Sequence, residues 1–363
     1  MKVAILWSSL ANYSVAFFRE LAQTHHCEIL LIYHSPRSVA PYKSFDLSFC
    51  TQSINFSENS SIDISHAVSV FHPDCLLLCS WNFPDYMKIA KTMRQKGAYV
   101  VSTIDHQWEG RLKQWLGVIT SRWFLKPRID GFLVAGDRQA NFARRLGYRN
   151  ILYGLYAATV ETFRTSIPLS IREPSFLFVG RIAPEKGIKN LIEAYRIYRH
   201  NSTLPWTLKI VGTGEMGLLA KNTPGVHTFG FVEPDKLPEM MHSSRALILP
   251  SLWEPWGVVI HEAAAAGLPI IATYACGAVT AYVREGINGF IVESDPVSIK
   301  DAMVKITQME SDALDNMGDG SKALAELWTP RKLAHYFFEN LKSAKTAIAE
   351  HNKSDAAAIH SIK

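Results

Sequence analysis

The stretch Leu249-Pro-Ser-Leu-Trp-Glu-Pro-Trp-Gly-Val-Val-Ile-His-Glu-Ala-Ala-Ala-Ala-Gly-Leu-Pro-Ile-Ile-Ala272 decides the fold. It begins at the end of an apolar run, Arg245–Leu249, and passes through a loop rich in proline and tryptophan. Gly257 then leads into an alanine-rich segment that favours a helix, and Pro269–Ala272 is a second apolar run. This order of elements predicts a βαβ unit within a parallel sheet.

The same alternation of short apolar runs with helical patterns extends outward over both halves of the chain. The predicted strands are Val3–Trp7, Glu28–Tyr33, Cys75–Cys79, Tyr99–Thr103 and Gly131–Ala135, then Ser175–Val179, Trp206–Val211, Arg245–Leu249, Pro269–Ala272 and Gly289–Val292. The pattern predicts an α/β protein with two doubly wound parallel-sheet domains, whose ligands would bind in a cleft at the carboxyl ends of the strands.

Domain boundaries follow from a break in this pattern. Thr165–Pro174 is polar, holds two prolines and has no periodicity, which is typical of a linker. We therefore expect one domain over residues 1–165 and another over 166–330. A further helix is expected over 331–349 and a disordered tail over 350–363.

The composition is that of an ordinary globular protein. The 363 residues carry a net charge of +5, and residues 1–165 hold 18 Lys and Arg against 12 Asp and Glu. No apolar run approaches the roughly 20 residues of a membrane-spanning helix. The five cysteines have no Cys-x-x-Cys spacing, so we expect buried thiols and a cytoplasmic protein.

Two acids in the opening stretch suggest a ligand. The first N–H groups of a helix beginning near Val258 lack partners inside the helix and favour an anion such as a phosphate. Glu254 precedes that helix end, and Glu262 lies on the helix, where a carboxylate could accept two hydrogen bonds from a sugar diol. The alternative is that Glu254 is a solvated loop acid and Glu262 a surface residue.

Two cations lie in the loop after another predicted strand. Arg181 and Lys186 belong to Gly180-Arg-Ile-Ala-Pro-Glu-Lys-Gly187 and are suited to neutralising a diphosphate. In the alternative reading they are ordinary solvated charges, with Glu185 as a local partner.

Taken together, Gly-Arg-Ile-Ala-Pro-Glu-Lys-Gly and the Glu-x7-Glu pattern resemble the retaining nucleotide-sugar glycosyltransferases of family 4 (glycosyl transferases group 1). The resemblance covers most of residues 173–330 and is thinner over 1–160. It implies a GT-B fold of two Rossmann-like domains, in which the N-terminal domain binds the acceptor and the C-terminal domain binds the donor. It also implies that the C-terminal helix crosses back to the N-terminal domain.

The resemblance also implies roles for individual residues. Arg181 and Lys186 match the diphosphate pair, Glu254 the acid at the donor sugar, and Glu262 the acid at the ribose. His106 resembles the histidine that approaches the donor sugar, although it could simply be a hydrogen-bonded residue at a strand end. The other positions that match donor-binding residues are Gly180, Gly212, Phe231, Val232, Gly257, Val258 and Val259.

The sequence departs from the family pattern at two places. Ser8-Ser-Leu-Ala-Asn12 replaces a glycine-rich loop, and Ala281 stands where the family has an acid. These departures leave a non-catalytic sugar-nucleotide binding protein as an alternative. A glycoside hydrolase using Glu254 and Glu262 is disfavoured, because both acids lie beside the expected phosphate site.

The expected ligands follow from this resemblance. We expect a UDP- or GDP-linked sugar donor, a saccharide or lipid-linked saccharide acceptor, no cofactor and no nucleic acid. No Asp-x-Asp occurs, and the cations with the helix end would supply positive charge, so no metal is expected. Arg111–Arg128 combines five basic residues with three aromatic ones and no acid, so it is either a peripheral membrane contact on the inner face of the membrane or an ordinary helix with core and solvated faces.

Overall fold

The computed structural model describes residues 1–34, 45–57 and 63–360, with side chains up to residue 346. The chain divides into two units, Met1–Tyr156 with Pro330–Lys363, and Ala157–Thr329. The polar, aperiodic segment that begins at Thr165 predicts this boundary between residues 165 and 166. In the structure the chain leaves the first unit nine residues earlier, and the segment Thr165–Pro174 lies inside the second unit.

The N-terminal unit is built on a parallel seven-stranded sheet in the order β3-β2-β1-β4-β5-β6-β7. Its strands are β1 (Lys2–Trp7), β2 (Glu28–Tyr33), β3 (Gln52–Asn55), β4 (Cys75–Leu78), β5 (Tyr99–Ile104), β6 (Gly131–Val134) and β7 (Ile151–Tyr153). Its helices are α1 (Asn12–His25), α2 (Ile64–Phe71), α3 (Pro84–Gln95), α4 (Leu112–Phe124), α5 (Asp137–Arg145) and α14 (Pro330–His360). The four residues of β4 are all buried, as expected for a central strand covered on both faces.

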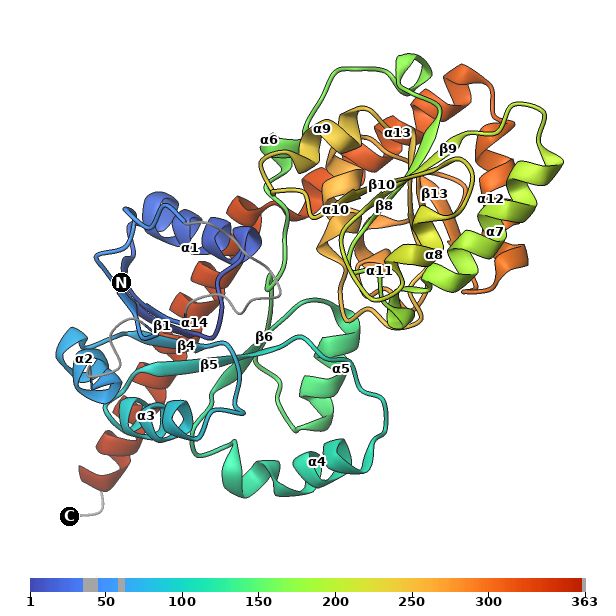
Figure 1. Ribbon diagram of the computed structural model, residues 1–363. Helices are drawn as coiled ribbons and strands as arrows, with labels where there is room; N and C mark the ends of the chain where they lie inside the picture. Colours follow the sequence, from blue (N-terminus) through green and yellow to red (C-terminus); the bar gives the residue numbers. More distant parts are fainter. Residues whose placement is uncertain (35–44, 58–62, 361–363) are drawn as a thin grey trace. The chain divides into compact units, whose positions relative to one another are not determined.

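The C-terminal helix α14 belongs to the N-terminal unit, where it lies beside α1 (Figure 1). Phe337 of α14 is fully buried, and its ring meets that of Phe17 at 5.6 Å, edge to face. His25 of α1 stacks on Phe338, with ring centroids 4.4 Å apart. The helix runs through His360, beyond residue 350, where the sequence analysis expects a disordered tail to begin.

The C-terminal unit is built on a parallel six-stranded sheet in the order β10-β9-β8-β11-β12-β13. Its strands are β8 (Ser175–Val179), β9 (Thr207–Val211), β10 (Val226–Gly230), β11 (Ala246–Leu249), β12 (Ile270–Thr273) and β13 (Gly289–Val292). Its α-helices are α6 (Val160–Phe163), α7 (Ile188–Asn201), α8 (Gly217–Lys221), α9 (Leu237–His242), α10 (Val258–Ala265), α11 (Val279–Tyr282), α12 (Pro296–Thr307) and α13 (Ser311–Ala325). Three short 3-10 helices complete it: η1 (Leu169–Ile171), η2 (Pro184–Lys186) and η3 (Glu326–Trp328).

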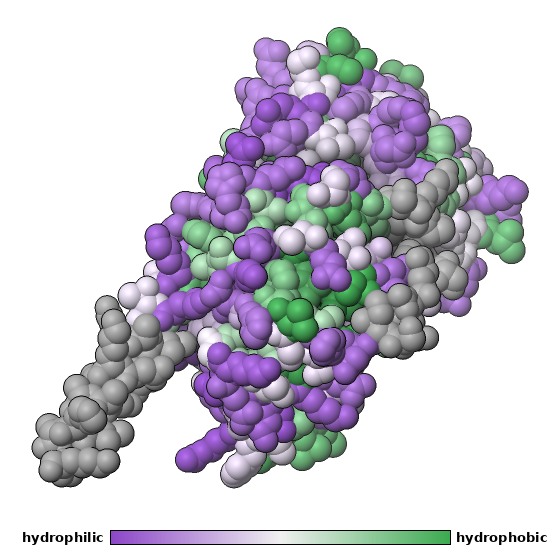
Figure 2. All heavy atoms as spheres, turned by 90° about the vertical axis from the view of Figure 1, so that its left-hand side faces the viewer, coloured by the Kyte–Doolittle hydropathy of each residue, from purple (hydrophilic) through white to green (hydrophobic). Residues whose placement is uncertain are grey.

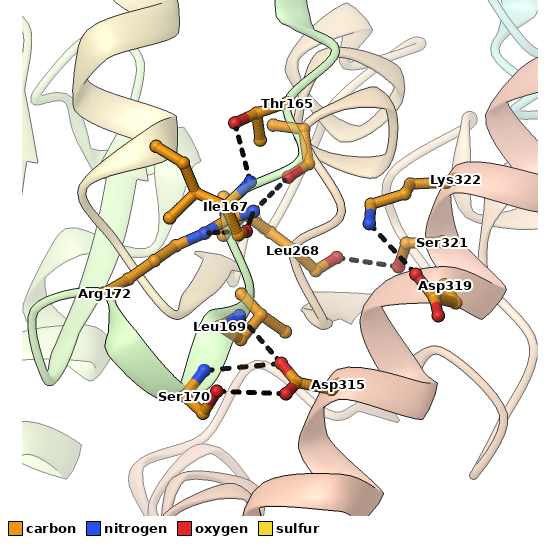
Figure 3. A network of polar contacts seen from close by, with 11 residues as sticks. Thr165, Ile167, Leu169, Ser170, Arg172, Leu268, Asp315, Asp319, Ser321 and Lys322 are labelled. Carbon is orange, nitrogen blue, oxygen red and sulfur yellow. Dashed lines mark hydrogen bonds and ion pairs between the residues drawn. The ribbon is translucent and has the colours of Figure 1, made fainter.

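Hydrogen bonds fix the segment before β8 to the body of the C-terminal unit (Figure 3). Asp315 of α13 accepts from the backbone of Leu169 at 2.7 Å and from the Ser170 hydroxyl at 3.0 Å. The buried guanidinium of Arg172 donates to the carbonyls of Ile167 and Ala266 at 2.8 and 3.0 Å. Burial lowers the Arg172 pKa to about 10, and these carbonyls supply the acceptors that the buried cation needs. The segment is therefore part of a domain and not a free linker.

The surface is chemically mixed. On the face shown in Figure 2, hydrophilic side chains predominate and hydrophobic ones gather near the middle. Over the described residues, every helix is too short or too polar to cross a membrane.

Candidate functional site

Four loops meet at the carboxyl ends of the C-terminal strands. A Cβ atom added to Gly212, after β9, would lie 1.9 Å from the carbonyl oxygen of Gly180, after β8. The same addition to Gly187 would come within 2.1 Å of the Pro250 carbonyl oxygen, after β11. A Cβ atom added to Gly277, after β12, would lie 2.2 Å from the carbonyl oxygen of Pro255. These backbones approach one another more closely than any side chain allows, so glycine is required at the contacts.

Lys186 and Glu254 form an ion pair at the centre of these loops. The Lys186 ammonium contacts Glu254 Oε2, and the two side chains are only 13% and 14% exposed. The loops that carry them are joined by backbone bonds, because Leu252 and Trp253 both donate to the carbonyl of Glu185, at 2.9 and 3.1 Å. A cation and a carboxylate 68 residues apart are thus held together with little contact with water.

Arg181 lies on the same loop as Lys186 but is more exposed. Its guanidinium pairs with Glu185 Oε1 at 2.7 Å. Glu185 is thus the local partner expected if Arg181 is an ordinary solvated charge. Both cations of the predicted diphosphate pair therefore have an acidic neighbour within the protein. A bound diphosphate would have to share them with Glu185 and Glu254 and would need further donors.

The end of α10 can provide those donors. Gly257 caps the helix with a φ of +87°, in the left-handed region that favours glycine. The backbone N–H groups of Val258 and Val259 follow in the first turn, where a helix has no internal acceptors for them. A Cβ on Gly257 would lie 3.1 Å from Glu254 Cγ, which places the Glu254 side chain against this helix end. An anion and Glu254 would share the region.

Glu262 lies further along α10 and is half-buried. Burial raises its carboxyl pKa to about 7. Within the described part of the chain, its carboxyl has no hydrogen-bond or ion-pair partner. A partly desolvated acid without a protein donor suits a ligand that supplies hydroxyl groups.

The neighbouring His261 has a different environment. Its Nδ1 accepts from the backbone of Ala158 at 2.9 Å, so Nε2 carries the proton and donates to the carbonyl of Ala325 at 3.0 Å. The ring stacks on Tyr282 at 4.1 Å, and burial lowers the pKa to about 4. The sequence analysis assigns no role to His261, and only the presence of a histidine in an alanine-rich helix could have drawn attention to it.

The remaining predicted donor residues lie on the strand-end loops as well. Phe231 and Val232 follow β10, where Gly230 has a φ of +66°, and the Phe231 ring is exposed. The sequence does not single out Trp256, which is buried and whose indole Nε1 has no hydrogen-bond acceptor among the described residues.

His106 belongs to the N-terminal unit. It follows β5, its imidazole is exposed, and Nε2 lies 3.6 Å from Asp105 Oδ1. Arg181, Lys186, Glu254 and Glu262 are thus residues of one unit and His106 of the other. Over the described residues, no three His, Cys, Asp or Glu side chains gather as a metal site would require.

Two Rossmann-like parallel sheets, one with glycine contacts and a helix end at its carboxyl edge, are typical of nucleotide-binding two-domain proteins. HepE of Anabaena, solved with UDP-glucose, has this architecture, with a TM-score of 0.72 at 16% identity over 94% of this chain and 100% of that one. The likeness shows that the protein has the GT-B fold.

The sequence comparisons agree. Residues 160–323 match the family described as glycosyl transferases group 1. An uncharacterized glycosyltransferase of Methanocaldococcus jannaschii is 34% identical over 151 residues, which cover 38% of this chain and 36% of that protein. The Escherichia coli UDP-Gal:alpha-D-GlcNAc-diphosphoundecaprenol alpha-1,3-galactosyltransferase is 30% identical over 151 residues, or 38% of each chain. The matched residues lie within the C-terminal unit, which is therefore similar in sequence to the glycosyl transferases group 1.

Proposed function

We propose that this protein transfers a sugar from a nucleoside-diphosphate sugar to an acceptor hydroxyl. The observation that carries the proposal is the half-buried carboxyl of Glu262, which has no partner among the described residues. It lies about one turn along α10 from the glycine-capped helix end, against which the Glu254 of the Lys186–Glu254 pair is placed. A ribose diol would donate to Glu262, and the diphosphate would accept from Val258 and Val259.

The diphosphate would also reorganise the ion pairs. Lys186 and Arg181 would donate some of their hydrogen bonds to phosphate oxygens in place of Glu254 and Glu185. Glu254 would then be free to accept from the hydroxyls of the donor sugar. Positive charge from both cations and the α10 end would stabilise the departing diphosphate without a metal ion.

We infer that the reaction retains the anomeric configuration by substitution on one face of the sugar. In this proposal Glu254 accepts from the hydroxyls of the donor sugar and does not act as the nucleophile, and the departing phosphate accepts the proton of the acceptor hydroxyl. His106 of the N-terminal unit would steady the donor sugar. The glycosidic bond to phosphate breaks as the bond to the acceptor oxygen forms.

The donor and acceptor are proposed by class. HepE was solved with UDP-glucose, and the name of the E. coli relative gives UDP-Gal as the donor and alpha-D-GlcNAc-diphosphoundecaprenol as the acceptor. These names support a UDP-sugar as the donor, and a GDP-sugar is the alternative donor. They also support a saccharide or lipid-linked saccharide as the acceptor, in polysaccharide or glycoconjugate assembly. The five free thiols support a reducing, cytoplasmic setting.

Calorimetric titration with UDP, GDP and ADP in EDTA tests the donor site. We expect one nucleotide to bind at least tenfold more tightly than the others and to bind equally well without metal. Release of free nucleoside diphosphate with a saccharide acceptor would separate transfer from mere binding, the alternative raised by Ser8–Asn12 and Ala281. NMR of the product's anomeric proton would contradict the mechanism if the configuration is inverted.

A further inference from the structure

The helix α4 of the N-terminal unit turns its apolar side away from the protein. Leu112, Trp115, Leu116, Ile119 and Trp123 are between 49% and 84% exposed. Their spacing of i, i+3, i+4, i+7 and i+11 places them on one stripe of about 100° of the helix surface. A helix of an ordinary globular domain buries such a stripe.

The side of α4 that packs on the unit is smaller and more polar. Ser121 is buried there and donates to the carbonyl of Leu146 at 3.1 Å. Val118 packs against the core, and Gln114 and Gly117 are half-buried on the same side. Of the stripe, Trp115 also reaches back to the unit, where its ring meets that of Trp108 edge to face at 5.2 Å. The helix lies at the margin of its unit in Figure 1.

Basic side chains flank the stripe on both edges. Lys113 lies on one side of it and Arg122 on the other by helical position. In the described structure, neither has an acidic partner within ion-pair distance. The nearby acids are already engaged, Glu109 with Arg111 at 2.5 Å and Asp130 with Arg94 at 2.7 Å.

A basic hollow of about 730 Å³ opens beside the C-terminal end of α4. Phe124 and Arg128 line it together with Lys88 and Lys91 of α3. Lys88 pairs with Asp85 at 2.9 Å, whereas Lys91 has no acidic neighbour among the described residues. The hollow thus adds positive charge next to the apolar stripe.

We infer that α4 docks this protein on an anionic lipid bilayer, with the stripe in the interface and the cations at the headgroups. Exposed tryptophans beside aliphatic residues suit that interface, and lysine and arginine at the stripe's edges suit anionic headgroups. A second copy of this chain is a poorer occupant, because a contact through the same stripe would bring Lys113 and Arg122 of both copies together. All the residues that would meet the bilayer belong to the N-terminal unit, so this docking is independent of the proposed sugar transfer.

Co-sedimentation of the full chain with vesicles tests the inference. We expect binding to phosphatidylcholine vesicles that contain phosphatidylglycerol, weak binding to phosphatidylcholine alone, and release as salt rises. The triple variant Leu116→Gln, Ile119→Gln, Trp123→Gln should lose binding by tenfold or more. Its control changes three apolar residues of the other unit that are still more exposed, Ile171→Gln, Leu204→Gln and Leu218→Gln, and should bind as the unchanged protein does.

The charge is tested separately. Lys113→Glu with Arg122→Glu should weaken binding to the anionic vesicles by about fivefold or more for each cation lost at low ionic strength. Lys221→Glu with Lys342→Glu makes the same change of net charge at exposed positions elsewhere and should have little effect. An unchanged thermal midpoint would show that each variant is folded.

Three results would overturn the inference. One is the absence of vesicle binding at low salt. Another is an equal loss of binding in the control variants. The third is sedimentation of the unchanged protein as a dimer that the stripe variant dissociates, which would assign α4 to a contact between copies.

Discussion

Two adjacent residues of α10 have opposite protonation behaviour. Burial raises the pKa of Glu262 to about 7 and lowers that of His261 to about 4, so both side chains are largely neutral near pH 6. His261 has backbone partners on both ring nitrogens, whereas the Glu262 carboxyl has no partner in the described parts of the chain. The difference separates a residue that holds the fold together from one that is available to a ligand.

The first prediction concerns the pH dependence of stability. The pKa of Glu262 is higher in the folded chain, about 7, than its reference value of 4.5, so the folded state binds more protons between these values. The free energy of unfolding should therefore fall as pH rises from about 4.5 to 7, by up to about 3 kcal/mol. Glu262→Gln should remove this fall.

Urea unfolding at pH 5 and pH 8 would measure it. His261 contributes with the opposite sign, since its folded pKa lies below 6.5, but it is present in both proteins and cancels in the difference. Equal pH slopes in the unchanged protein and in Glu262→Gln would rule out this account of Glu262.

The second prediction separates Lys186 from Glu254. Lys186→Ala leaves an acid without its partner at a largely buried position, so the unfolding free energy should fall by on the order of 3 kcal/mol. It should also weaken nucleoside diphosphate binding by tenfold or more. Glu254→Gln frees Lys186 for phosphate, so nucleotide affinity should not fall, while sugar transfer slows.

Calorimetry and a transfer assay would check both variants. Arg181→Ala is the matched comparison, since Arg181 is exposed and its removal should weaken nucleotide binding with little loss of stability. A Glu254→Gln variant with weakened nucleotide binding and normal transfer would refute the division of roles.

At the scale of elements, the sequence predicts the central strands and misses most of the sheet edges. Three strands were not predicted, β3, β7 and β10, and each lies at the edge of its sheet. An edge strand pairs on one side only and can be exposed on a face, so Gln52–Asn55 needs no continuous apolar run. No helix is predicted from the sequence over α13 either, because Gly318 weakens the helical pattern there.

That glycine has a packing role. A Cβ on Gly318 would lie 2.7 Å from the Gly267 carbonyl oxygen and 2.8 Å from Leu169 Cδ1. The residues Arg181, Lys186, Glu254 and the local partner Glu185 were visible in the sequence, but the pairing of Lys186 with Glu254 was not. Lys186 meets Glu254 only through the convergence of two strand-end loops, and tertiary contacts of that kind leave no local pattern.

The third prediction concerns the glycine contacts of these loops. Gly212→Ala places a Cβ 1.9 Å from the Gly180 carbonyl oxygen at a φ of +136°, so the loops after β8 and β9 must separate. We expect the free energy of unfolding to fall by about 2–3 kcal/mol. Nucleotide binding should weaken as well. Gly217→Ala in α8 is the control.

Gly217 has open space around its Cβ position and begins a helix, so alanine there should be neutral or stabilising by up to about 1 kcal/mol. Urea unfolding of the two variants measures the difference. Similar stabilities for both would contradict the close approach of Gly180 and Gly212.

At the scale of the whole molecule, the chain passes twice between units that carry different parts of the proposed chemistry. The first passage follows Tyr156 and the second follows Thr329. Within the C-terminal unit, His261 of α10 joins Ala158 to Ala325, which lie close to the two passages along the chain. The helix that bears Glu262 is thus bonded to both segments where the chain enters and leaves its unit.

The last prediction uses the return of α14 to the N-terminal unit. Phe337→Ala removes a fully buried ring from the contact with Phe17, so this unit should lose about 3–5 kcal/mol of unfolding free energy. Tyr336→Ala is the neighbouring control, since Tyr336 is exposed and its loss should cost less than about 1 kcal/mol.

Differential scanning calorimetry with and without the nucleotide that binds would follow both units. Because the proposed donor site lies in the C-terminal unit, the nucleotide should still raise one transition temperature in Phe337→Ala while the other transition falls. If Phe337→Ala and Tyr336→Ala melt alike, α14 does not hold the N-terminal unit together; if Phe337→Ala abolishes the nucleotide's effect, the two units do not unfold as separate cooperative parts.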